Sequence, residues 1–96
     1  MAKGGWTYIL TNKPGGVLYI GVTADLAERI MQHRAGRGSV FCKRYGVKRL
    51  VLAERHESID AAILREKALK AWQRAWKIRL VEEANPLWDD LFEHIT

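Results

Sequence analysis

Two short apolar segments joined by a turn limit most strongly what this chain can fold into. Residues 6–11 (Trp-Thr-Tyr-Ile-Leu-Thr) and 17–22 (Val-Leu-Tyr-Ile-Gly-Val) are rich in the β-branched and aromatic side chains that favour strands. The intervening Asn-Lys-Pro-Gly-Gly is typical of a turn, so the segments predict an antiparallel hairpin. Because both strands are apolar on both faces, we expect helices to cover the sheet.

The rest of the chain carries mostly helix signals and one more strand signal. We expect a helix at 25–35, a short helix or turn at 39–46, a strand at 48–55, and helices at 58–72, 74–84 and 87–94. This order predicts an α+β fold in which helices flank a small three-stranded antiparallel sheet. A length of 96 residues favours a single domain, residues 1–96, around one small core.

Several classes of protein are excluded by what the sequence lacks. No apolar run approaches the roughly 18 residues of a membrane span, and residues 1–5 lack the apolar region of a signal peptide. Cys42 is the single cysteine, so an internal disulfide and a cysteine-based metal site are both excluded. We therefore expect a soluble cytoplasmic protein that does not act at a membrane.

Charge is distributed unevenly along the chain. Sixteen Lys and Arg face eleven Asp and Glu, for a net charge of +5. Fourteen of the basic residues but four of the acids lie in residues 29–79, whereas residues 80–96 hold five acids and no Lys or Arg. Such asymmetry is what a phosphate-binding surface would show. A solvated basic face with a compensating acidic tail explains it equally well.

Glu66 is the most informative single residue. On a helix it shares a face with Ile59, Ala62, Ile63 and Leu69, which places a carboxylate within an apolar stripe. A buried carboxylate is normally paired, protonated or bound to a metal. Two alternatives to a metal ligand remain for Glu66. It could form an ion pair with Lys67, Lys70 or a basic residue of a strand, or it could lie at the solvent edge.

Four further residues have chemistry suited to a site. Arg29 and His33 are four residues apart, so they share one helix face, where a guanidinium can bind phosphate and an imidazole can transfer a proton. Tyr8 and Tyr19 lie on adjacent strands, but the sequence does not fix their register. The structural alternative for Arg29 and His33 is an ordinary pair of solvated polar residues. For Tyr8 and Tyr19 it is packing against the core.

Other conspicuous residues have structural interpretations. Asn85 directly before Pro86 is typical of a helix N-cap followed by proline at the first helical position. The tryptophans are expected mainly in the core, although an exposed one could stack a base. These residues are Trp6, Trp72, Trp76 and Trp88.

The tyrosines, Arg29, Glu66 and Asn85, taken in their order along the chain, resemble the motifs of the GIY-YIG nuclease superfamily. The resemblance spans residues 6–92 and is to the small stand-alone bacterial members in particular. Trp6-Thr7-Tyr8 stands where the family has Gly-Ile-Tyr, and Tyr19-Ile20-Gly21 matches the second half of the motif after ten residues. The residues that match the family's further motif positions are Arg29, Glu66 and Asn85.

The resemblance implies metal-assisted hydrolysis of phosphodiester bonds. Glu66 would hold one Mg²⁺ or Mn²⁺, and Tyr19 would activate the attacking water, directly or through Tyr8. Arg29 would stabilise the transition state, and His33 would assist the proton relay. The implied substrate is nucleic acid, DNA rather than RNA, in repair or processing.

Asn85, by the same resemblance, would orient the backbone or the substrate. Several nucleases of the superfamily carry a lysine at the position of Val22, so the activation of Tyr19 needs another source here. Six basic residues outside the motif are expected to contact the nucleic-acid backbone. They are Arg34, Arg37, Lys43, Arg44, Lys48 and Arg49.

Two other functions stay open at this point. The basic stretch and Val22 are compatible with a DNA- or RNA-binding module whose catalysis is weak or lost. The acidic tail 80–96 with Trp88 is compatible with a protein-interaction domain, or the tail folds back on the basic body. The sequence leaves open whether the chain acts through a protein partner or as a homodimer.

Overall fold

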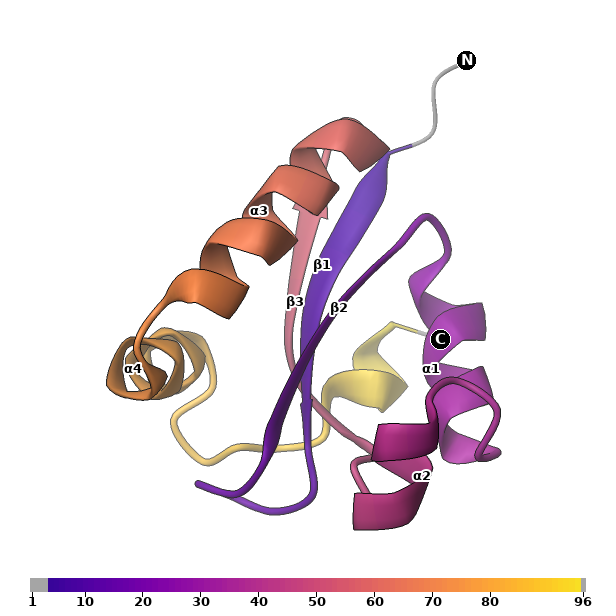
Figure 1. Ribbon diagram of the computed structural model, residues 1–96, viewed down its shortest axis with the longest axis vertical. Helices are drawn as coiled ribbons and strands as arrows, with labels where there is room; N and C mark the ends of the chain where they lie inside the picture. The colour runs from indigo at the N-terminus through magenta and orange to yellow at the C-terminus, as the bar shows by residue number, and fades with distance from the viewer. Residues whose placement is uncertain (1–3, 96) are drawn as a thin grey trace.

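A three-stranded antiparallel sheet forms the centre of the protein (Figure 1). The computed structural model describes residues 4–95. The strands β1 (Gly5–Thr11), β2 (Leu18–Thr23) and β3 (Arg49–His56) lie in the order β2-β1-β3. The predicted hairpin is confirmed, and Asn12 closes its turn by accepting a hydrogen bond from the amide of Val17.

Helices form at the predicted places and begin at side-chain caps. Asp25, Ser39 and Ser58 each accept a hydrogen bond from a backbone amide three residues further on. The helices are α1 (Leu26–Arg34), α2 (Val40–Tyr45), α3 (Ile59–Ala71), α4 (Arg74–Ala84) and a 3₁₀ helix, η1 (Leu91–His94). The last helix is shorter than predicted, because a turn precedes it and its cap is Asp90.

Both faces of the sheet are covered, which confirms the α+β prediction. In Figure 1, α3 and α4 lie on one side of the sheet, and α1, α2 and η1 lie on the other. One apolar cluster, under α1 and α2, contains Tyr8, Leu10, Leu26, Ile30, Cys42, Val47 and Leu50. The second cluster, under α3 and α4, contains Ile9, Ile20, Val51, Leu52, Leu69, Val81 and Trp88. The central strand β1 thus contributes to both cores.

The acidic C-terminal segment folds back on the body. Asp90 pairs with Arg34 and accepts a hydrogen bond from the amide of Leu50. Arg49 donates to the carbonyl oxygen of Trp88, whose side chain is buried. The segment is therefore part of the fold, which removes the motive for a separate interaction tail.

Three of the four tryptophans lie in or against the core, as expected. Trp88 is buried, but Trp76 is half exposed, and Trp6 and Trp72 are partly buried at the rims of the two clusters.

Within residues 4–95, no helix combines the length and the apolar composition that crossing a membrane requires.

Candidate active site

The register of the hairpin places the two tyrosines on one face of the sheet. Tyr8 lies opposite Gly21, and Leu10 lies opposite Tyr19. Directly opposed residues share a face, and so do residues two apart on one strand, so Tyr8 and Tyr19 are diagonal neighbours. The sequence left this register open, and the structure fixes it.

Helix α1 brings His33 against Tyr8. The hydroxyl of Tyr8 lies 3.0 Å from Nε2 of His33, and each residue is 1% exposed. Burial raises the pKa of Tyr8 to about 12. Burial, followed by the charge of Arg29, lowers the pKa of His33 to about 4. At neutral pH the phenol therefore keeps its proton, and the imidazole that shares this hydrogen bond is neutral.

Two glycines make room for these buried rings. A Cβ atom at Gly21 would lie 2.3 Å from the hydroxyl oxygen of Tyr8, and one at Gly38 would lie 2.5 Å from Nδ1 of His33. The glycine of the Tyr19-Ile20-Gly21 motif is thus explained by close packing against Tyr8 across the strand pair. Nδ1 of His33 is buried without a hydrogen-bond partner among the described residues.

Arg29 extends from α1 toward both tyrosines. Its guanidinium donates to Oε1 of Gln32 and to the carbonyl oxygen of Gly38, each at 3.1 Å. A hydrogen bond with the hydroxyl of Tyr8 is the main cause that raises the pKa of Arg29, and the hydroxyl of Tyr19 adds to it. The structure thus fixes a permanent positive charge beside two phenols.

Tyr19 differs from Tyr8 because it borders an open hollow. Its ring lies edge-on to His33, with 5.4 Å between centroids, and stacks on Phe41 at 6.3 Å. The hollow, about 290 Å³ in volume, is lined by Leu18, Tyr19, Ile20, Phe41, Lys70 and Lys77. A substrate in this hollow would therefore meet Tyr19, whereas Tyr8 is shielded.

Glu66 lies on α3, the helix that lends Lys70 to the same hollow. Its side chain is 15% exposed, and Nζ of Lys70 lies 3.4 Å from Oε2. The ion pair considered from the sequence has formed. The described contacts link Glu66 to the tyrosines only indirectly, through Lys70 at the rim of the hollow.

A divalent metal could be held here by a single protein carboxylate, that of Glu66. In the described part of the chain, no three His, Cys, Asp or Glu side chains converge to form a metal cage. Glu66 offers one carboxylate of low exposure. Mg²⁺ is often bound through one or two carboxylates with phosphate oxygens and water completing its shell, so Glu66 with a bound phosphate suits that ion.

Asn85 is positioned apart from the Tyr–His–Arg group. It ends α4 as the C-cap, so the expected N-cap role at Pro86 is wrong. Its Nδ2 donates to the carbonyl oxygens of Val51 (3.1 Å) and Asp89 (2.8 Å), and its Oδ1 accepts from the amide of Asp89. Asn85 therefore orients the backbone between β3 and the C-terminal segment.

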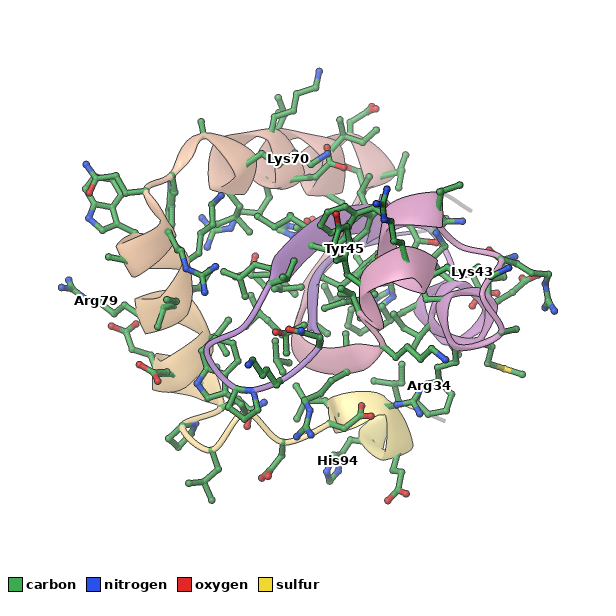
Figure 2. The ribbon with its side chains drawn as sticks, turned by 60° about the horizontal axis from the view of Figure 1, so that its bottom comes forward. Arg34, Lys43, Tyr45, Lys70, Arg79 and His94 are labelled. Atoms are coloured by element: carbon green, nitrogen blue, oxygen red, sulfur yellow. The ribbon has the colours of Figure 1, made fainter. Side chains whose placement is uncertain are left out.

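The six basic residues expected at the nucleic-acid backbone fall into two groups. The guanidinium of Arg34 pairs with Asp90 and lies over the ring of Phe92, and Figure 2 shows Arg34 directed toward η1. Arg49 is likewise engaged with the C-terminal segment. Both arginines thus have partners within the chain, and their contact with phosphate stays a prediction. The side chains that remain exposed are Arg37, Lys43, Arg44 and Lys48.

Sequence reasoning missed two residues of the hollow, Phe41 and Lys77. Phe41 lies in a segment whose structure was ambiguous, and Lys77 lies on a helix without any motif residue. A helical projection of α2 could have indicated Phe41, because it lies on the exposed side between basic residues.

The three-stranded sheet, the paired tyrosines and the Arg29–His33 helix together define a GIY-YIG domain. Residues 4–79 match the GIY-YIG catalytic domain, and the chain belongs to this family. It is 34% identical over 87 residues to a UPF0213 protein of Aeromonas salmonicida, covering 91% of this chain and 63% of that protein. It is 35% identical over 83 residues to a UPF0213 protein of Natronomonas pharaonis, covering 86% of this chain and 96% of that protein.

A solved structure agrees with this assignment. The solution NMR structure of a UPF0213 protein from Bacillus halodurans matches with a TM-score of 0.57 and 29% identity, covering 91% of this chain and 92% of that one. The three-stranded antiparallel sheet with flanking helices is thus shared with a solved relative.

Proposed function

We propose that the protein is a metal-dependent endonuclease that hydrolyses phosphodiester bonds in DNA, in repair or processing. The observation that carries the proposal is the grouping of Tyr8, Tyr19, Arg29 and His33 on one sheet face beside an open hollow. Membership in the family of the GIY-YIG catalytic domain supports a reaction on nucleic acid.

In the proposed reaction, the role of each residue follows from whether its side chain borders the hollow or is buried. Tyr19, at the hollow, activates the attacking water beside the positive charge of Arg29. Arg29 also stabilises the charge of the pentavalent phosphorus. Tyr8 and His33 contact Arg29 and Tyr19 and hold them in position. With a pKa of about 4, His33 is a weak base, which does not favour the proton relay that the family resemblance implies. Mg²⁺ or Mn²⁺ at Glu66 would supply Lewis-acid stabilisation of the phosphate and the leaving oxygen.

Several nucleases of the superfamily have a lysine at the position of Val22. Two lysines of the hollow could replace the amine of that lysine. Lys70 and Lys77 line the hollow together with Tyr19. The two amines place positive charge at the hollow that Tyr19 borders, where they would attract a phosphate.

A cleavage panel tests the proposal. Plasmid, single-stranded and branched DNA, and an RNA of the same sequence, are incubated with Mg²⁺ or Mn²⁺. We expect DNA cleavage by the wild type, with a loss of at least about a hundredfold in Tyr19→Phe and Glu66→Gln. Glu57→Gln, at an exposed carboxylate, is the matched control and should cleave normally. Equal cleavage by Glu66→Gln and the wild type would sink the proposal.

A second function, nucleic-acid binding with weak or lost catalysis, is favoured by one observation. Glu66 is already paired with Lys70, which competes with a metal for the carboxylate. In that case DNA or RNA should bind in EDTA with an affinity that falls steeply with salt, and no metal should induce cleavage. Robust metal-dependent cleavage excludes this alternative.

A further inference from the structure

A row of aromatic rings leads from the candidate active site to the surface of α2. Tyr19 stacks on Phe41 with an interplanar angle of 24°, and the centroids of Phe41 and Tyr45 are 4.9 Å apart. Phe41 is 42% exposed and Tyr45 is 49% exposed. The guanidinium of Arg44 lies 5.6 Å from the centroid of Tyr45. These outer rings are only partly used by the core, so they present aromatic surface to a ligand.

The opposite wall of the hollow carries two lysines, of which Lys70 is also paired with Glu66. Lys70 comes from α3, and Lys77 comes from α4, across the edge strand β2 from Phe41. Nζ of Lys77 donates to the carbonyl oxygen of Lys70 at 3.4 Å, which holds the two lysines at one rim. Figure 2 labels Tyr45 on α2 and Lys70 on α3, which come from opposite faces of the sheet. The floor between the walls is apolar, formed by Leu18 and Ile20.

We propose that this hollow binds one unpaired nucleotide beside the scissile phosphate, with its base against Phe41 and its phosphate at Lys70 and Lys77. The inference rests on the proposed function and names its substrate class. The aromatic wall suits a base, and the apolar floor suits a sugar. The two amines suit a phosphate. A base can reach Phe41 only outside its own stack, so the substrate is a strand with an unpaired nucleotide rather than continuous duplex.

Binding without catalysis tests the subsite directly. Fluorescence anisotropy in EDTA compares a labelled single-stranded DNA oligonucleotide with the same sequence as a duplex. Phe41→Leu removes the ring but keeps an apolar side chain, and it should weaken single-strand binding about tenfold while leaving duplex binding unchanged. Phe41→Trp should restore the affinity. Lys77→Gln should weaken single-strand binding and reduce its dependence on salt.

Trp76→Leu is the control, since Trp76 is a half-exposed aromatic residue outside this hollow. It should bind both oligonucleotides like the wild type. Equal affinity of Phe41→Leu and the wild type for single-stranded DNA, or equal weakening for both oligonucleotides, would overturn the subsite. Thermal melting of each variant separates loss of binding from loss of the fold.

Cleavage of the same oligonucleotides with Mn²⁺ separates this inference from the proposed function. If the wild type binds single strands through Phe41 but cleaves nothing, the endonuclease proposal fails and the nucleotide subsite stands. If the wild type cleaves and Phe41→Leu keeps the same preference between single strand and duplex, the subsite fails and the endonuclease proposal stands. A wild type that neither binds nor cleaves refutes both.

Discussion

Replacing Asn85 by alanine should destabilise the fold without removing the chemistry. The amide side chain makes three hydrogen bonds, to the carbonyl oxygen of Val51 and to both backbone groups of Asp89. A net contribution of about 1 kcal/mol per bond, with one bond buried, predicts a loss of about 3 kcal/mol in the free energy of unfolding. For a domain of this size that loss lowers Tm by roughly 12–24 °C.

Urea and thermal unfolding followed by circular dichroism measure this loss. Asn12→Ala is the matched control, because Asn12 is exposed and accepts one hydrogen bond in the hairpin turn. It should cost less than about 1 kcal/mol. The comparison separates a buried amide that joins two segments from an exposed amide that supports a turn.

Two results would refute this reasoning. A loss below 1 kcal/mol in Asn85→Ala would show that the three hydrogen bonds are replaced by water. A variant with an unchanged Tm but no cleavage would show that Asn85 acts on the substrate, as the family resemblance implies. We expect cleavage to persist at temperatures where the variant remains folded.

Three further predictions follow from the buried site. Because His33 has a folded-state pKa of about 4 against an ordinary 6.5, its contribution to stability is complete above pH 6.5. About 3 kcal/mol should be lost as the pH falls to about 4, measured by urea unfolding, and the loss should be absent in His33→Gln. Gly21→Ala forces the ring of Tyr8 away, so it should cost about 1–3 kcal/mol and reduce cleavage at least tenfold; wild-type-like values would show that the ring adapts. Chelation by EDTA should stop cleavage while leaving Tm nearly unchanged, since the fold has no metal cage within residues 4–95; a large fall in Tm would contradict this.

The secondary structure could be predicted because its signals are local. Asp25, Ser39 and Ser58 cap helices through amides three residues away, and the hairpin turn is closed within its own sequence. The register of the two tyrosines needs the pairing of β1 with β2, which alternation alone does not set. The fit of Tyr8 against Gly21, where no Cβ has room, is visible only once the two strands are paired.

Long-range contacts account for what was missed. Arg34 reaches Asp90 across 56 residues, so this ion pair cannot be derived from local charge. The hollow needs Phe41 and Lys77 from opposite faces of the sheet. Trp88 adopts a left-handed backbone conformation (φ 58°) that is rare for a large side chain, and its side chain is buried.

The strand order has a consequence for how this protein can associate. β2 is an edge strand, and the hollow with Tyr19 opens along it. A second polypeptide that added a strand to β2, as in β-augmentation, would cover the hollow that the proposed reaction needs open. Active assemblies would have to form through other surfaces. A peptide designed to pair with β2 would lie beside Tyr19 and would compete with a nucleic acid for the hollow.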